Sequence, residues 1–146
     1  PEGCAVLPPE NPQLEAEKLR RELEEELGVK LGVVVVDSFV QPLRLGTVGL
    51  AVGFSGFEPV RNYVGKNDLW GRQLKVSNLQ VADSVATAAH LLMGEGSEGV
   101  PVVVLKGAPV ELTDEEMSYE EACMPADRCL FFSAFKEASD SRLRGG

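Results

Sequence analysis

Four consecutive valines followed by Asp37 and Ser38 constrain this chain more than any other feature. An uninterrupted apolar run rich in β-branched residues predicts a strand over residues 31–37 that is buried on both faces. Functional residues gather where such strands emerge into loops. A carboxylate at that exit is costly if it stays dry and unpaired, so it must meet water, a hydrogen-bond cluster or a cation. Two interpretations of Asp37 stay open: a solvated strand end that caps the next turn, or a metal ligand.

Length and charge exclude several classes of protein. The chain has 146 residues, of which 44% are hydrophobic, and this suits one domain with a real core. No apolar run approaches the roughly 18 residues that a membrane helix needs. The net charge of −9 argues against sequence-independent binding of nucleic acid, which needs clustered Lys and Arg. Because the chain begins at Pro1 without an initiator Met and without the pattern of a signal peptide, we expect it to be incomplete.

Cysteine usage points to a reducing compartment. The chain has three cysteines, Cys4, Cys123 and Cys129, with no C-x-x-C spacing and a single histidine, His90. This set excludes the common zinc patterns and argues against a disulfide framework. We therefore predict a cytoplasmic setting.

The periodic segments predict an α+β fold, with a mixed, partly antiparallel sheet packed on two main helices. The helices are expected over residues 13–27 and 79–93, the first with Asn11 as N-cap and Gly28 as its end. The strands are expected over residues 31–37, 47–53, 73–77 and 100–105. The first intervals are too short for parallel crossovers, so some pairing must be antiparallel. Residues 1–110 form the predicted core, and residues 111–146 form an acidic extension with a short helix near 113–123.

Glycine and alanine recur at positions where backbones can come close together. Glycines at 46, 49, 53 and 56 indicate bulges or close backbone approach, with a loosened, twisted sheet as the alternative. Alanines at 82, 86 and 89 form a stripe that permits packing on the sheet or on another chain. Residues 63–77 read as a hairpin with charges at its tip. The Gly-rich run at residues 94–99 can expose N–H groups to phosphate, although it lacks the Lys-Ser/Thr of a P-loop. His90 reads as a packed or capping histidine.

The order of these motifs carries more information than any one of them. The sequence runs through Gly32-Val33-Val34-Val35-Val36-Asp37-Ser38-Phe39, then Tyr63-x-Gly65-x-x-Asp68-Leu69-Trp70-Gly71-Arg72, then Leu92-Met93-Gly94-Glu95-Gly96-x-x-Gly99-Val100-Pro101. Over roughly residues 6 to 107 this set resembles the coenzyme F420-0:L-glutamate (γ-glutamyl) ligase family.

The resemblance implies a GTP-dependent enzyme that activates a carboxylate of coenzyme F420-0 as an acyl phosphate and joins it to L-glutamate. It implies Mg²⁺ or Mn²⁺ held by Asp37, Ser38 and Glu95, with Asp37 as the catalytic residue. It also implies a homodimer and a guanine-nucleotide site. The residues carried over to that nucleotide site are Met93, Gly94, Glu95, Gly96, Ser97, Glu98, Gly99 and Val100.

Departures from the family pattern leave alternatives open. The chain reads Val40-Gln41-Pro42-Leu43-Arg44 where the family usually has Gly-Arg-Pro, and Asp83-Ser84 where it has Asp-Glu. The family's N-terminal half, which supplies further nucleotide contacts and another metal ligand, has no counterpart in this sequence, so a separate subunit could supply it. The alternatives are a non-catalytic dimerisation or regulatory module, and a related GTP-dependent amide ligase with a different acyl donor or acceptor.

Overall fold

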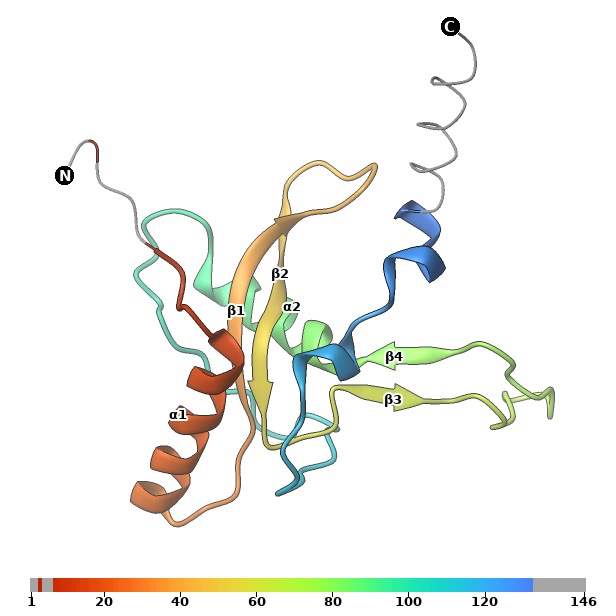
Figure 1. Cartoon of the computed structure of the whole chain (residues 1–146), viewed down its shortest axis with the longest axis horizontal. Helices are drawn as coiled ribbons and strands as arrows, with labels where there is room; N and C mark the ends of the chain where they lie inside the picture. Colours follow the sequence, from red (N-terminus) through yellow and green to blue (C-terminus); the bar gives the residue numbers. More distant parts are fainter. Residues whose placement is uncertain (1–2, 4–6, 133–146) are drawn as a thin grey trace, which may run out of the picture.

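The computed structural model describes residue 3 and residues 7–132 as an α+β domain. A long β1–β2 ribbon lies between α1 and α2, and the β3–β4 hairpin extends to one side (Figure 1). No helix in this part of the chain has the length and apolar character needed to cross a membrane. The elements in chain order are α1 (Pro12–Leu27), β1 (Val33–Val40), β2 (Thr47–Ser55), β3 (Val60–Asn62), β4 (Asn78–Gln80), α2 (Val81–Met93) and the 3₁₀ turns η1 (Tyr119–Ala122) and η2 (Ala126–Arg128).

Helix α1 begins and ends where its capping residues predict. The side chain of Asn11 accepts a hydrogen bond from the N–H of Leu14 at 3.0 Å. At the other end Gly28 adopts a left-handed conformation and its N–H bonds the carbonyl of Glu24. Both contacts satisfy backbone groups that a helix end leaves without partners. The predicted helix and both of its ends are confirmed.

Strand β1 is longer and more exposed than the valine run predicts. It pairs antiparallel with β2 from Val33 opposite Ser55 to Val40 opposite Thr47. Because pairing continues to Val40, Asp37 and Ser38 lie inside the strand, and the expected exit at residue 37 is wrong. The valines are only partly buried, since a two-stranded ribbon leaves its edges uncovered. The pairing of β3 with β4 is also antiparallel, so the described residues contain no parallel pair.

Close backbone approach explains two glycines of β2. A Cβ added at Gly49 would lie 2.4 Å from the Cβ of His90 and 2.9 Å from the carbonyl oxygen of Ala86. A Cβ added at Gly53 would lie 2.3 Å from the carbonyl oxygen of Pro12. Helix α2 therefore packs directly on β2 at Gly49, and the start of α1 does so at Gly53. The interpretation of close approach is confirmed at both positions, and a bulge between Val35 and Val36 accompanies it.

The alanine stripe of α2 faces the chain's own core. Ala82 and Ala86 are fully buried, and they cluster with Phe54, Phe57 and Val81. Asp83, in the first turn of α2, accepts a hydrogen bond from the N–H of Ala51 at 3.0 Å next to the bulge. The stripe is thus used within the domain, which leaves it unavailable as a surface for dimerisation.

Two predicted strands are wrong. Residues 73–77 belong to an irregular part of the β3–β4 hairpin, where Asp68 accepts hydrogen bonds from the N–H groups of Trp70 and Arg72 and bends the tip. Regular pairing resumes only at β4. Residues 100–105 form no strand because, within residues 7–132, no neighbouring segment bonds their backbone.

The first part of the predicted acidic extension packs against the core. Thr113 N–H donates to the carbonyl of Gly56 at 3.0 Å, and Met117 and Ala122 pack on the core cluster. The helix predicted near 113–123 is wrong, since only the 3₁₀ turn η1 forms there. The backbone of this segment first bonds the edge of the core at Thr113. It turns only after Ser118, which makes a capping box with Glu121. Residues 133–146 of the extension, like Cys4, lie outside the described residues.

Gly49→Ala tests the packing of α2 on β2. We expect it to lower the free energy of unfolding by about 1–3 kcal/mol, because the new methyl overlaps atoms of His90 and Ala86 that belong to a packed helix. Denaturant unfolding of the chain measures this. Gly96→Ala is the matched control, since its Cβ would come no closer than 3.4 Å to Glu98, and it should change the stability by no more than about 0.5 kcal/mol. Equal stability of wild type and Gly49→Ala would contradict the packing described here.

Candidate functional site

Glu95 lies at the centre of a polar cluster between the end of α2 and the β1–β2 ribbon. It follows the C-cap Gly94, whose N–H bonds the carbonyl of His90. The Glu95 carboxylate accepts a hydrogen bond from the hydroxyl of Thr47, and the Nε2 of His90 lies 2.8 Å from Oε1. A carboxylate oxygen only accepts when it is ionised, so His90 Nε2 carries the proton in this contact.

The same cluster includes Ser38, which lies on β1 opposite Gly49. Hydrogen bonds from Thr47, then from His90 and Ser38, hold the pKa of Glu95 below its ordinary value, although partial desolvation acts in the opposite direction. Glu95 is therefore anionic at neutral pH. The structure thus brings together two of the three predicted metal ligands, from segments far apart in the sequence.

Asp37, the third predicted ligand, is exposed and faces the opposite side of β1 from Ser38. Its carboxylate accepts the backbone N–H of Ser38 at 2.8 Å. Among the described contacts it has none with Glu95. In this structure Asp37 is a solvated carboxylate that accepts a neighbouring N–H, and its other oxygen faces water on the strand surface.

The predicted nucleotide segment, residues 93–100, begins at the last residue of α2 and continues as a glycine-rich loop, in which a backbone N–H bonds a carboxylate of the same loop. The N–H of Gly96 donates to a carboxylate oxygen of Glu98 at 2.8 Å. Gly94 and Gly99 both have positive φ, which lets the loop turn tightly. Carboxylate and phosphate oxygens accept the same backbone hydrogen bonds. The loop can thus present N–H groups to a phosphate once Glu98 moves aside.

The donor set suits part of a site for a hard divalent cation. Asp37, Ser38 and Glu95 offer oxygen atoms, the ligands that Mg²⁺ and Mn²⁺ prefer. The bond from His90 to Glu95 is of the kind that orients ligands from outside the coordination shell. Across residue 3 and residues 7–132, however, no three His, Cys, Asp or Glu residues lie close enough to hold a metal ion. The described residues therefore offer at most a partial donor set for such an ion.

Thr47 and the contact made by His90 were not identified from sequence. Thr47 becomes visible only when the register places it opposite Val40, at the end of the ribbon where a loop joins the two strands. His90 was expected to pack or cap, and its side chain, 14% exposed, does pack against β2 at Gly49. Its bond to Glu95 depends on the turn after α2, which no local spacing predicts.

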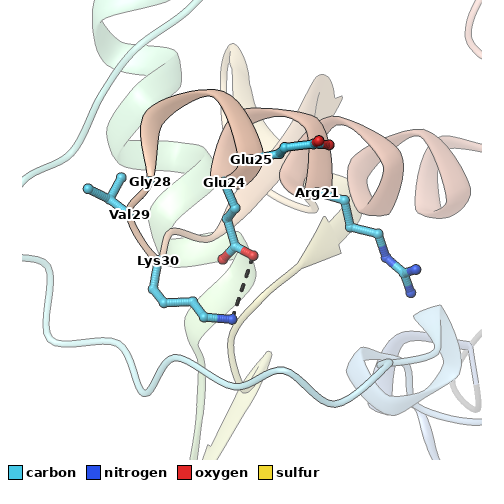
Figure 2. A pocket seen from close by; sticks show the side chains of 6 residues that line it. All are labelled: Arg21, Glu24, Glu25, Gly28, Val29 and Lys30. Atoms are coloured by element: carbon cyan, nitrogen blue, oxygen red, sulfur yellow. Dashed lines mark ion pairs between the residues drawn. The ribbon is translucent and has the colours of Figure 1, made fainter.

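A shallow pocket lies at the other end of the ribbon, beside the C-terminus of α1 (Figure 2). Its cations are already paired with carboxylates: Lys30 with Glu24 at 3.8 Å and with Asp114, and Arg21 with Glu116 at 2.7 Å. These ion pairs tie the segment beyond residue 107 to α1. The residues that line the pocket come before the start of β1, whereas Glu95 and Ser38 lie near its other end, so the two regions are separate.

Comparison with known proteins decides the family. The family described as F420-0:Gamma-glutamyl ligase matches residues 1–107. The chain belongs to this family. The F420 ligase resemblance drawn from the ordered motifs is therefore confirmed.

Named relatives agree with this assignment. Coenzyme F420:L-glutamate ligase of Archaeoglobus fulgidus is 43% identical over 131 residues, covering 88% of this chain and 53% of the relative. The protein of the same name from Methanocaldococcus jannaschii is 44% identical over 108 residues, 74% of this chain and 43% of the relative. That of Methanosarcina mazei is 40% identical over 105 residues, 72% of this chain and 41% of the relative. This F420 ligase family member thus spans about half the length of these relatives.

Thr47→Val tests the electrostatics of the Glu95 cluster. Removing the hydroxyl removes the largest contribution that lowers the pKa of Glu95, so this pKa should rise toward its ordinary value. Carboxyl carbon-13 NMR titration of selectively labelled protein reads it directly. Thr113→Val serves as control, because the hydroxyl of Thr113 accepts a hydrogen bond from the backbone N–H of Glu115. It should leave the titration of Glu95 unchanged. A Glu95 pKa that does not respond to Thr47→Val would show that the two side chains do not bond in solution.

Proposed function

We propose that this chain is part of a GTP-dependent ligase that adds L-glutamate to coenzyme F420-0. The chain would supply strand β1 with Asp37 and Ser38, and the glycine-rich run of residues 94–99, called the Glu95 loop below. Family membership supports the ligase activity. The observation that carries the proposal is the cluster of Ser38, Thr47, His90 and Glu95, because it joins the predicted metal strand to the predicted nucleotide loop.

The amide would form through an acyl phosphate intermediate. A free carboxylate does not form an amide at a useful rate, so the γ-phosphoryl group of GTP passes to the carboxylate of F420-0 and GDP leaves. The amine of L-glutamate then attacks the acyl carbon, the C–O bond to phosphate breaks, and the amine loses a proton. Amide and inorganic phosphate are the products. No side-chain nucleophile is needed, so the free thiols of Cys123 and Cys129 have no part in this reaction.

Charge neutralisation is the main requirement of this chemistry. The phosphoryl transfer brings several negative charges together in a chain whose own net charge is −9. Mg²⁺ or Mn²⁺ would neutralise phosphate oxygens and align donor with acceptor. Ser38 and Glu95 would hold the ion from one face of β1, while His90 and Thr47 keep Glu95 ionised and oriented. Asp37 faces the other side of β1 in this structure, so it would join the ion only when binding of the ion and of the rest of the ligase turns its side chain round the strand. The N–H of Gly96 would bind a phosphate oxygen in place of Glu98.

The remaining ligands would come from the part of the relatives that this chain does not match. That part makes up roughly half of the A. fulgidus protein and more of the other two. It would complete the coordination shell, which needs about six oxygens for Mg²⁺, and would add nucleotide contacts. A homodimer, as the resemblance implies, would have to use a surface other than the alanine stripe.

Turnover should require both parts of the ligase. We expect the chain by itself to release no GDP and form no glutamylated product from F420-0, GTP, Mg²⁺ or Mn²⁺ and L-glutamate. Co-production with the unmatched part of the A. fulgidus relative should restore both products. Turnover by the isolated chain would contradict the incomplete site. A well-folded complex that stays inactive with every component present would favour a non-catalytic module.

Asp37→Asn separates a metal ligand from a solvated carboxylate. In the complex with the relative's part, it should weaken Mn²⁺ binding and activity by at least ~10-fold, because even an outer-shell partner has an effect of this size. Calorimetric titration of Mn²⁺ with GTP present measures the binding. The fold should survive, since Asn keeps the bond to the N–H of Ser38. Exposed Asp127→Asn is the matched control. Equal Mn²⁺ affinities of Asp37→Asn and wild type would return Asp37 to a capping role.

A further inference from the structure

Residues 100–105 form an apolar segment that the described chain covers only in part: Val103 is half-buried, while the valines on either side of it are exposed. The exposed fractions are 74% for Val102 and 75% for Val104, with 38% for Val100 and 39% for Leu105. Within residues 7–132, no backbone hydrogen bond or β-bridge joins this backbone to another segment. The composition, four valines and a leucine around Pro101, is that of an edge strand, and no strand pairs with it in the described part of the chain.

Such an exposed edge is a liability that folded proteins normally remove. Unpaired N–H and C=O groups flanked by valines template pairing with another chain. Glu98 precedes the segment and Lys106 follows it, so charge protects only its two ends, and Pro101 is the one residue within it that cannot donate to a partner strand. The last turn of α2, just before the loop, also leaves Leu91 at 84% and Leu92 at 61% exposed. Exposed apolar surface on both sides of the Glu95 loop indicates an interface.

The lengths of the relatives indicate what covers this edge. Residues 100–105 lie inside the stretch that matches the family, so the segment belongs to the family's fold. The chain nevertheless accounts for only 53%, 43% and 41% of three relatives. The unmatched part of these relatives is long enough to supply a pairing strand.

We propose that residues 100–105 pair as an edge strand with a strand from the part of the ligase that this chain does not contain. The inference rests on the proposed function in so far as it treats the chain as one part of a larger ligase. The pairing strand would be extended, would bond the free N–H and C=O groups, and would set apolar side chains against Val102 and Val104. Because residues 100–105 continue directly from the Glu95 loop, this pairing would also fix the loop against the part that completes the site.

Hydrogen exchange tests the pairing directly. The chain is co-produced with the unmatched part of the A. fulgidus relative and the complex is compared with the free chain. We expect the amides of residues 102–105 to exchange freely in the chain alone and to become protected in the complex. Continued free exchange in the complex, failure of any complex to form, or protection that appears in the chain alone as its concentration rises would each overturn the proposal, the last because a second copy would then be the partner.

A charge substitution gives an independent measurement. The double variant Val102→Lys/Val104→Lys should keep the unfolding midpoint of the free chain, because both side chains are exposed there. It should weaken the complex at least ~10-fold, equivalent to about 1.4 kcal/mol. Val76→Lys, at a valine 87% exposed on the β3–β4 hairpin, is the control and should change affinity no more than ~2-fold. Wild-type affinity of the double variant would refute the pairing. A complex with protected amides and no turnover would refute the proposed function alone.

Discussion

The close approach of α2 to β2 at Gly49 positions the rest of the candidate site. With no side chain at that position, the Cβ of His90 and the carbonyl of Ala86 come directly onto the strand, and Thr87 hydroxyl bonds the carbonyl of Gly49 at 2.8 Å. The end of the helix then lies near the end of the ribbon where the loop joins β1 to β2. From there Glu95 reaches the hydroxyls of Thr47 and Ser38. A larger residue at 49 would move the helix and separate the two segments on which the proposed chemistry depends.

Local signals were sufficient for the elements that depend on neighbours in sequence. The Asn11 cap and the Gly28 end predicted α1, and the apolar period predicted α2 to within two residues at its start and to the residue at its end. The glycine spacing predicted close backbone approach, which Gly49 and Gly53 confirm. The ordered motifs were specific enough to identify the family. Each of these inferences needs no knowledge of which segments pair.

Features that depend on pairing could not be derived in this way. The end of β1 is set by Thr47 and Val48 of β2, so the valine run alone placed Asp37 at an exit that does not exist. The role of Thr47 follows from the same register. Residues 100–105 show the reverse case: their composition is that of a strand, yet a strand needs a partner, and none is present in the described chain. The start of the helix expected near 113–123 is likewise set by a distant segment, since the N–H of Thr113 bonds the carbonyl of Gly56.

The central claim is that the strand end and the glycine-rich loop form one cation and nucleotide site. Paramagnetic broadening by Mn²⁺ tests it in the nitrogen-15 spectrum of the labelled chain, bound to the relative's part with GTP present. If the claim holds, the amides of Ser38, Thr47 and Glu95 lose intensity together at the same Mn²⁺ concentration, while those of the hairpin near Val76 keep theirs. Broadening confined to one of the two segments, or centred on the acidic residues around Asp114 to Glu116, would contradict it.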